Sequence, residues 1–540
     1  MIRTYHVAFA FVAAIFALVL TACDEEQEAP PAAEATLADT GRELVQAICT
    51  GCHVKRDDGS LSRISFGRRT PEGWDMTLVR MMNFHGLSLT KEDRRAIVKY
   101  LSDTQGLAPS ETVPFRYALE RRPNIIESGQ DQTMMEMCAR CHSFARVGLQ
   151  RRTKEEWLNL VHMHVGQWPT IEYQAMARDR DWWDDARGRV VDDLARAFPL
   201  DDPAWAAWQD AQRHALTGKW RFVSYQPGQG YHHGTLEFTE ESKDEYTVHF
   251  DSTGPDGVAV SGDYNGILYT GFEWRGRGDF GGQPGREVAA LSEDGNLLAG
   301  RWFHAERPEM GALFEARRVG SGSAIMGVDG EALRRGAETT LVILGTGLSG
   351  ELDLGPGITT EVTAASESQI TARVRVASDA ALGRRSLRVG SLVSKDAVAV
   401  FDRIDRVVVT PDYATARVGG NGGATPIQAA QFEAVAMHNG ADGEPGTADD
   451  FRIGVVDAEW STAPWNEVAA EMNDDKFAGV ISPAGLFTPG KAGPNPARVY
   501  GTNNAGDLKV IATVQDGDRT VTGEAHLIVT VQRWNSPPIY

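Results

Sequence analysis

The spacing of apolar residues changes near residue 215, which divides the chain into a helical part and a part made of strands. Before that point apolar residues recur every three or four positions, as expected for one face of a helix. Two such segments contain Leu44, Val45 and Ile48, and Ile97, Val98 and Leu101. Beyond it, glycines and alternating β-branched residues dominate. The pattern predicts a multidomain chain that is first α and then all β.

Helix start and stop signals place the helices of the first part in two similar units. Thr90-Lys91-Glu92-Asp93 and Thr153-Lys154-Glu155-Glu156 both have the form of a capped helix start. Gly106 ends the first of these segments, and Pro199 ends a later helical segment. We therefore expect one helical unit at residues 36–108 and another at residues 109–215.

The second part of the chain carries strand patterns bounded by glycine or charged turns. Four of them lie at residues 235–239, 246–250, 266–269 and 297–303. Together they predict a closed antiparallel barrel over residues 216–322. A Gly-x-Trp tripeptide at Gly218, repeated at Gly300, is similar to the streptavidin-like barrels.

Strand patterns continue toward the C-terminal end. Their intervals are typical of β-sandwiches at residues 340–344, 370–376 and 386–389, and again at residues 508–514 and 526–531. We therefore expect two immunoglobulin-like β-sandwiches, at residues 323–405 and 406–540.

The N-terminal segment is typical of an export signal. Arg3 precedes an apolar run from Val7 to Leu20, which is too short to span a bilayer comfortably. We expect a signal peptide at residues 1–22 and a flexible tether, rich in Glu, Pro and Ala, at residues 23–35. Leu20-Thr21-Ala22-Cys23 also looks like a bacterial lipobox. Lipidation of Cys23, with a membrane tether, and ordinary cleavage after a small residue are both open alternatives.

Two copies of the motif Cys-x-x-Cys-His, at residues 49–53 and 138–142, carry the clearest chemical signal. In each copy two thiols one helical turn apart can add across the vinyl groups of one haem, and the adjacent histidine can ligate its iron. We therefore expect two covalent haem c groups. The expected attachment residues are Cys49, Cys52, Cys138 and Cys141, and the expected proximal ligands are His53 and His142. A structural zinc site would need further cysteines or spaced histidines.

The cysteine count and the charge exclude several other properties. With four cysteines on haem and the fifth, Cys23, in the N-terminal segment, none is left for a disulfide, so stability must come from packed cores. The formal net charge of −20 argues against nucleic acid and against a polybasic membrane surface. The acidic stretch at residues 442–450 lacks the alternate-oxygen spacing of an EF-hand, which favours a solvated loop over a calcium site.

Several residues could bind each iron on the distal side. The candidates are Met76, Met81, Met82 and His85 after the first motif, and His162, Met163 and His164 after the second. Aligning residues 78–82 with residues 160–164, each after a tryptophan, sets Met82 opposite His164. We therefore favour Met82 and His164 as the distal ligands, and Met81, His85 and Met163 are the alternatives. Methionines at helical spacing can also serve only as core packing. Unequal ligands would give the haems unequal potentials and a directed electron path.

Each helical unit resembles cytochrome c, in which a helix leads into Cys-x-x-Cys-His, a loop carries the sixth ligand and an amphipathic helix closes the fold. The whole mature chain resembles the alpha subunit of quinohemoprotein amine dehydrogenase. The residues that carry this resemblance are the two haem motifs and the stretches at residues 70–76, 177–183 and 419–423.

The resemblance implies a periplasmic heterotrimer that oxidises primary amines to aldehydes and ammonia. In that family a small subunit bearing cysteine tryptophylquinone is held against a β-propeller subunit, and the alpha subunit carries the haems. This chain would take electrons from the quinone one at a time and pass them to a cupredoxin or a cytochrome c. It would supply no catalytic acid, base or nucleophile.

Two other functions are open on the sequence alone. A self-contained di-haem oxidoreductase, of the peroxidase or thiosulfate dehydrogenase type, would need an iron with an open or displaceable sixth position. A haem-bearing surface binding module would use its large β part for recognition. An absorption spectrum distinguishes the di-haem oxidoreductase from an electron-transfer protein. Co-purification of a quinone-bearing chain distinguishes an electron-transfer subunit from a surface binding module.

Overall fold

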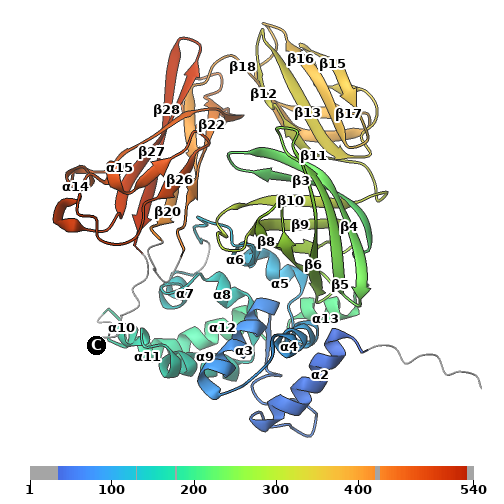
Figure 1. Cartoon of the computed structure of the whole chain (residues 1–540), viewed down its shortest axis with the longest axis vertical. Helices are drawn as coiled ribbons and strands as arrows, with labels where there is room; N and C mark the ends of the chain where they lie inside the picture. The colour runs from blue at the N-terminus through green and yellow to red at the C-terminus, as the bar shows by residue number, and fades with distance from the viewer. Residues whose placement is uncertain (1–34, 129–130, 177–178, 420–425, 532–540) are drawn as a thin grey trace, which may run out of the picture.

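The computed structural model describes residues 35–128, 131–176, 179–419 and 426–531 of the 540-residue chain. Figure 1 shows helices at one end of the molecule, a β-barrel in the middle and two further β-regions at the other end. The predicted order, helices followed by strands with a closed barrel among them, is confirmed. The expected signal peptide, Cys23 and the tether up to residue 34 lie outside the described residues, as do residues 177–178 and 420–423 of the stretches quoted above.

The helical part runs from α2 to α13. Its elements are α2 (Leu37–Ile48), η1 (Cys49–Gly51), α3 (Pro71–His85), α4 (Lys91–Thr104), α5 (Pro109–Thr112), η2 (Val113–Phe115), α6 (Arg116–Leu119), α7 (Gln132–Cys138), α8 (Ala145–Gly148), α9 (Lys154–Gln167), α10 (Ile171–Ala175), α11 (Trp182–Asp185), the π-helical η3 (Ala186–Val190), α12 (Val191–Ala197) and α13 (Pro203–Asp210). Thr90 and Thr153 cap α4 and α9 as predicted. No helix in the described ranges has the length and apolar content needed to cross a bilayer.

A short two-stranded sheet joins the two helical units. Strand β1 (Gly67–Arg69) pairs antiparallel with β2 (Gln150–Arg152), and Arg68 lies opposite Arg151. Each strand runs directly into the N-cap of a long helix, Thr70 before α3 and Thr153 before α9. The first unit therefore has the order β1, Thr70, α3, and the second has the matching order β2, Thr153, α9. Because β1 and β2 are antiparallel, an approximate two-fold axis through the sheet relates the two.

The carboxylate of Glu111 pairs with an arginine from each strand of this sheet. It accepts two hydrogen bonds from the Arg68 guanidinium, at 2.8 and 3.0 Å, and Arg151 Nε lies 2.8 Å from its Oε1. All three side chains are buried. Because a buried charge is costly unless it is paired and hydrogen-bonded, both arginines depend on this one carboxylate.

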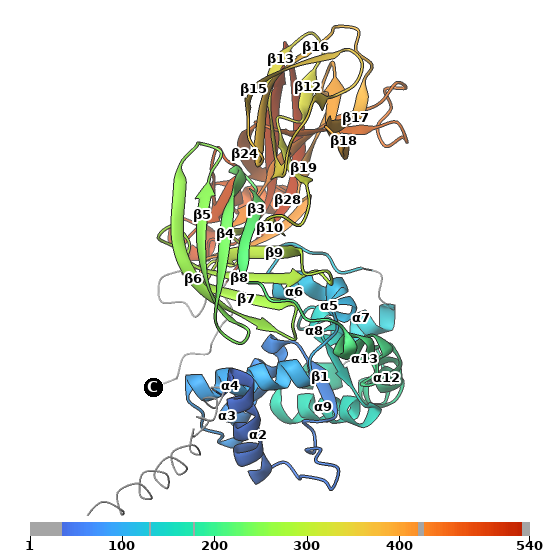
Figure 2. The ribbon, with the colours of Figure 1, turned by 90° about the vertical axis from the view of Figure 1, so that its right-hand side faces the viewer.

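Eight antiparallel strands form the closed barrel that follows the helices (Figure 2). They are β3 (Gly218–Gln226), β4 (Gly230–Ser242), β5 (Glu245–Thr253), β6 (Ala259–Tyr269), β7 (Glu273–Asp279), β8 (Pro284–Leu291), β9 (Leu297–His304) and β10 (Gly311–Arg318). Aromatic rings fill the interior, among them Trp220, Phe238, Tyr246, Tyr264 and Trp274. The barrel is therefore a packed core, as small barrels commonly are.

The barrel also contacts both helical units. Ile267 and Tyr269 belong to the apolar core of the first unit, and Val288 and Phe303 belong to the core of the second. Arg275 of β7 also forms an ion pair with Glu72 in the first turn of α3. The barrel thus fixes the two helical units relative to one another.

The next β-region consists of two four-stranded sheets around one apolar core, ordered β11-β13-β16-β15 and β12-β18-β17-β14. Its strands are β11 (Ala324–Asp329), β12 (Ala332–Arg334), β13 (Glu338–Thr346), β14 (Leu352–Asp353), β15 (Ile358–Ala365), β16 (Gln369–Val376), β17 (Gly383–Val389) and β18 (Leu392–Phe401).

The last β-region has sheets ordered β19-β22-β23, β20-β28-β27-β24 and β21-β26-β25. Its elements are β19 (Arg406–Thr410), β20 (Tyr413–Arg417), β21 (Ala430–Gln431), β22 (Glu433–His438), β23 (Phe451–Val456), β24 (Glu459–Pro464), α14 (Glu467–Glu471), α15 (Asp474–Phe477), β25 (Gly479–Ile481), β26 (Leu486–Pro489), η4 (Val499–Gly501), β27 (Gly506–Asp516) and β28 (Arg519–Thr530). It lies beside both the barrel and the helical part (Figure 1).

One carboxyl group is buried among the aromatic rings of the barrel. Glu287 Oε2 accepts hydrogen bonds from the Tyr264 hydroxyl, at 3.0 Å, and from the Trp274 indole nitrogen. Burial raises the pKa of Glu287 from 4.5 to about 7, although the two hydrogen bonds act in the opposite direction. The folded barrel therefore keeps a proton that the unfolded chain loses at lower pH.

Replacing Glu111 by glutamine is expected to destabilise the helical part by about 3–5 kcal/mol, because two buried guanidinium groups lose their counter-charge. Urea unfolding followed by circular dichroism measures this loss. Asp192→Asn is the matched control, since Asp192 pairs with Lys154 on the surface of the same region, where an ion pair contributes at most about 1 kcal/mol. Equal unfolding midpoints for the two variants would contradict the role of Glu111.

The stability of the barrel is expected to fall as the pH rises from about 4.5 to about 7. Over this range the unfolded chain loses the Glu287 proton while the folded barrel keeps it, so the unfolded state is favoured as the pH rises. Thermal unfolding followed by tryptophan fluorescence at several pH values measures the trend. Glu287→Gln cannot ionise and should lose this part of the dependence. A variant with the slope of the natural chain would exclude Glu287 as its source.

Candidate haem sites

The first Cys-x-x-Cys-His motif follows the end of α2. The turn η1 begins at Cys49, and the N–H of His53 donates to the Cys49 carbonyl at 2.8 Å. Cys49 is half-buried, Cys52 is exposed, and neither forms a disulfide. His53 Nδ1 lies 2.8 Å from the carbonyl oxygen of Ser62. Because the Nδ1 proton is donated there, Nε2 keeps a lone pair for a metal.

The second motif repeats this arrangement at the end of α7. Cys138 is half-buried and Cys141 is exposed, and neither forms a disulfide. His142 Nδ1 lies 3.0 Å from the Ser143 carbonyl oxygen, which leaves Nε2 available. Burial raises the pKa of the Cys138 thiol to about 11 and lowers the pKa of His142. A neutral imidazole is the form that ligates a metal.

The distal candidates lie on two helices, whereas the resemblance to cytochrome c places the sixth ligand in a loop. Met81 and Met82 lie on α3, and Met163 and His164 lie on α9. The reason is local, because each segment begins with a threonine N-cap and no proline interrupts it beyond the first helical position.

The helix starts also correct the alignment of the two units. Arg-Arg-Thr occurs before both Trp74 and Trp157, and in each unit the threonine is the N-cap of the helix. Counting from these N-caps sets Met81 opposite His164, so the alignment that sets Met82 there is wrong by one residue. That alignment pairs Leu78 with Leu160, which follow their tryptophans by four and by three residues.

The surroundings of the two tryptophans support the corrected register. Trp74 and Trp157 are both buried, and each donates its indole hydrogen to a backbone carbonyl of its own unit, at 3.0 and 3.2 Å. An arginine guanidinium lies over each ring, Arg69 over Trp74 and Arg152 over Trp157. The two tryptophans are therefore structural equivalents.

His164 is presented as a metal ligand would be. Its Nδ1 lies 2.7 Å from the carbonyl oxygen of Leu160 in the preceding turn, so Nε2 is the free nitrogen. Burial lowers the pKa of His164, and the charge of nearby His142 adds to this effect. The proximal and distal candidates of the second unit therefore lie near one another.

The other distal candidates have different contacts. The ring of His162 lies against Trp183, with centroids 5.2 Å apart. His85 is exposed at the end of α3, and its Nε2 lies 3.4 Å from Nε2 of Gln167 on α9. The guanidinium of Arg146 contacts the sulfur of Met76. These contacts join α3 to the second unit, so the two candidate sites lie side by side.

The surface around the two motifs suits a large apolar ring. Val54 next to His53 is 69% exposed, Phe84 on α3 is 52% exposed and Val165 on α9 is 51% exposed. Exposed apolar side chains on the elements that carry the candidate ligands are compatible with a binding surface. Paired thiols, neutral imidazoles and apolar surface are what a covalent haem requires, so the residues present fit the expected group.

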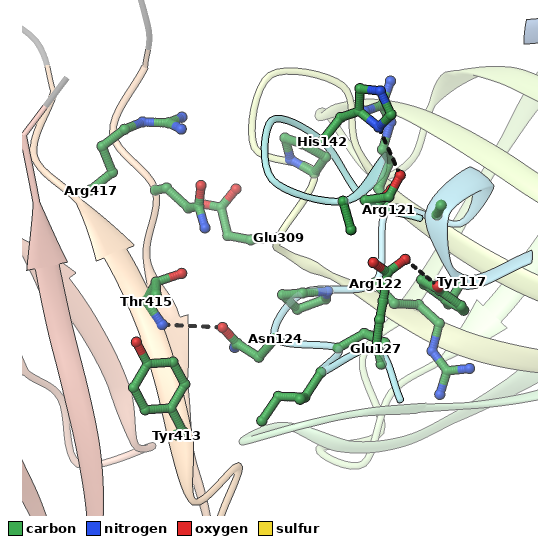
Figure 3. Close-up of a pocket in the computed structure, with 18 of the residues that line it drawn as sticks. Tyr117, Arg121, Arg122, Asn124, Glu127, His142, Glu309, Tyr413, Thr415 and Arg417 are labelled. Carbon is green, nitrogen blue, oxygen red and sulfur yellow. Dashed lines mark hydrogen bonds between the residues drawn. The ribbon is translucent and has the colours of Figure 1, made fainter. Parts of the chain in front are cut away.

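A pocket of about 730 Å³ opens beside the second motif (Figure 3). Its walls come from His142 and the segment before α7, from Glu309 of the barrel and from β20 of the last β-region. The backbone N–H of Thr415 donates to Asn124 Oδ1 at 3.2 Å between two of these walls. The pocket shares His142 with the candidate haem site, whereas neither cysteine of the motif nor His164 is among the lining residues.

The acidic stretch at residues 442–450 forms hydrogen bonds within itself and its flank. Asp449 accepts the N–H of Ala441 at 2.6 Å, and Asp450 accepts the N–H of Gly446 at 2.8 Å. Among the described residues, no group of three or more His, Cys, Asp and Glu side chains is arranged to hold a metal ion.

Four family models match the chain, and all of them describe the alpha subunit of quinohemoprotein amine dehydrogenase. The haem-binding model matches residues 39–205, domain II residues 213–319, domain III residues 323–402 and domain IV residues 407–539. Together they cover the described part of the chain almost completely and occur in the order of one subunit. No curated protein matches the chain.

Solved structures match separate parts of the chain at low scores. A redesigned β-barrel, mFAP1, bound to DFHBI is 14% identical with a TM-score of 0.17, over 19% of this chain and 94% of that one. The fluorescent protein UnaG is 13% identical with a TM-score of 0.15, over 19% and 96%. Mouse clustered PcdhgC3 EC1-3 is 9% identical with a TM-score of 0.17, over 46% and 76%. Likenesses at these scores carry no argument about function.

Proposed function

This chain belongs to the family of quinohemoprotein amine dehydrogenase alpha subunits, and from that premise we propose that it is the di-haem electron-transfer subunit of an amine dehydrogenase complex. The observation that carries the proposal is the presence of two Cys-x-x-Cys-His motifs in one helical part, each with a histidine that presents Nε2. We assign no catalytic acid, base or nucleophile to this chain.

Cys49 and Cys52 would hold one haem c through thioether bonds, and Cys138 and Cys141 would hold the other. When bound, a haem supplies a one-electron iron couple. His53 and His142 would ligate the irons through Nε2. Their Nδ1 hydrogen bonds to backbone carbonyls fix the ring orientations that this requires.

For the second site we propose His164 as the distal ligand. For the first site the helix register favours Met81 over Met82, because Met81 has the place on α3 that His164 has on α9. A methionine sulfur favours the reduced iron more than a second imidazole does, so the first site would have the higher potential. His85 and Met163 are the further alternatives.

The proposed complex follows from the family. A small subunit with cysteine tryptophylquinone would oxidise primary amines to aldehydes and ammonia, and a β-propeller subunit would hold it against this chain. A quinone gains two electrons per amine, whereas a cupredoxin or a cytochrome c accepts one. Two one-electron sites in one chain would separate the pair. We place the complex in the periplasm, with a lipid on Cys23 as an open alternative.

We propose a domain assignment along the same lines: cytochrome c-like units at residues 36–108 and 109–215, a streptavidin-like barrel at 216–322, and immunoglobulin-like sandwiches at 323–405 and 406–540. The element order supports it, since α13 ends at Asp210, β3 begins at Gly218 and β10 ends at Arg318. The β1–β2 sheet connects the first two units, so they would act as one body.

The purified complex, mixed anaerobically with a primary amine, is expected to show reduction of its haems, seen as a sharper α band and a shifted Soret band in stopped-flow absorption. The double variant Cys138→Ala/Cys141→Ala should keep one covalent haem and lose the other, because it has a single complete motif. Haems that dithionite reduces, but that no primary amine reduces, would contradict the proposed electron transfer.

Met81→Ala is expected to remove the weak near-infrared band of sulfur-ligated ferric haem and to lower the potential of that haem, because alanine supplies no ligand. Met82→Ala is the matched control, one residue further along the same helix, and should keep the band. The absorption spectrum of the oxidised protein checks both. Loss of the band in Met82→Ala alone would assign the iron to Met82.

A further inference from the structure

We propose that an arginine cluster between the two haem motifs binds the propionate carboxylates of the haems. The arginine cluster consists of Arg63, Arg69, Arg80, Arg146 and Arg152. The inference rests on the proposed function, because it requires both motifs to carry haem, and it adds a binding role for side chains outside those motifs.

The arginine cluster has far more positive than negative charge. Within the described chain its carboxylate partner is Glu156, whose Oε2 lies 2.9 Å from Arg63 Nε and 3.9 Å from Arg152. The three other arginines form no ion pair with any described Asp or Glu side chain. Five guanidinium groups and one carboxylate leave a net charge of about +4.

Much of this charge is buried, and its hydrogen bonds go mainly to neutral groups: Arg152 donates to Gln150 and Arg80 donates to Thr77. Arg69 is 6% exposed and Arg152 is 3% exposed. The buried Nε atoms of Arg69 and Arg80 have no hydrogen-bond partner among the described residues. Burial lowers the pKa of Arg69, and repulsion from neighbouring arginines lowers it further. Because a buried cation needs a counter-charge, these groups require an anion that the described chain does not supply.

The β1–β2 sheet separates these arginines from the paired ones. Successive side chains of a strand point to opposite faces. Arg68 and Arg151 reach Glu111 on one face, so Arg69 and Arg152 point to the other face. On the first face the Glu111 carboxylate lies within 3 Å of both arginines. On the second face Arg152 lies 3.9 Å from Glu156, which is already paired with Arg63, and Arg69 has no carboxylate partner among the described residues.

The arginine cluster reaches both candidate sites. Arg80 directly precedes Met81 on α3, and Arg146 follows the second motif and contacts the sulfur of Met76 on α3. An anion held by these two arginines would therefore lie close to the candidate ligands of both irons.

Haem propionates match the arginine cluster in charge and in geometry. Each haem has two propionate groups, so two haems bring four carboxylates to a cluster of net charge about +4. A guanidinium binds a carboxylate through two parallel hydrogen bonds, which a lysine cannot provide. The propionate edges of the two haems would then meet at the arginine cluster.

Arg80→Gln and Arg146→Gln in the purified complex test the proposal. Arg146 is exposed, so its variant should fold even if Arg80→Gln does not. Arg196→Gln is the matched control, because the Arg196 side chain is 75% exposed and pairs with Asp193 outside the cluster. Pyridine hemochrome spectra give the haem content, spectroelectrochemical titration gives the midpoint potential, and resonance Raman spectra give the propionate bending bands.

We expect all three variants to keep two haems. The two test variants should shift the propionate bands, and the control should leave them unchanged. A cation beside a propionate favours the ferrous state, so its loss should lower the ratio of reduced to oxidised haem up to tenfold at a given potential, which is about 59 mV for one electron. Arg80→Lys keeps the charge and should recover most of the potential, but not the bands.

Unchanged propionate bands would overturn the proposal even if the potential falls, because a distant cation can change the potential without touching a propionate. Loss of a partner subunit with unchanged bands would assign the arginine cluster to carboxylates of that partner, and would also overturn it. A natural complex without haem would overturn the proposed function itself, whereas two haems with unchanged bands would overturn this inference alone.

Discussion

The geometry of both candidate haem sites depends on the buried pairing of Glu111 with Arg68 and Arg151. The two arginines face one another across the β1–β2 sheet, and each strand runs straight into the helix that carries a distal candidate, Met81 or His164. One carboxylate therefore fixes how α3 and α9 lie relative to each other. Because all three charges are buried, a shift of either strand would leave a charge without its partner, and the arrangement is held stiffly.

The same constraint makes the two helical units one body. The barrel adds to it, because side chains of β6 enter the first apolar core and side chains of β8 and β9 enter the second. Two cytochrome-like units with independent positions would vary the distance between their irons. Here the sites lie side by side on a common base, which suits the passage of single electrons between them without domain motion.

Local signals in the sequence predict much of this fold, and contacts between distant segments decide the rest. Thr153 and its capping partner predict the start of α9, and alternating residues predict strands that indeed form one closed barrel. The choice between Met81 and Met82 needs the helix register, because the two side chains are neighbours with the same chemistry. The repeated Arg-Arg-Thr is visible in the sequence and could have set that register. Glu111, which pairs with an arginine of each repeat, lies in a different segment, and no sequence pattern marks it as buried.

The central claim is that both motifs hold haem covalently within this one helical body, and peptide mapping of the mature chain tests it most directly. After non-covalent haem is extracted with acidified acetone, mass spectrometry identifies the peptides that contain residues 49–53 and 138–142. The account predicts one haem on each peptide. Recovery of either peptide with two free thiols would contradict it.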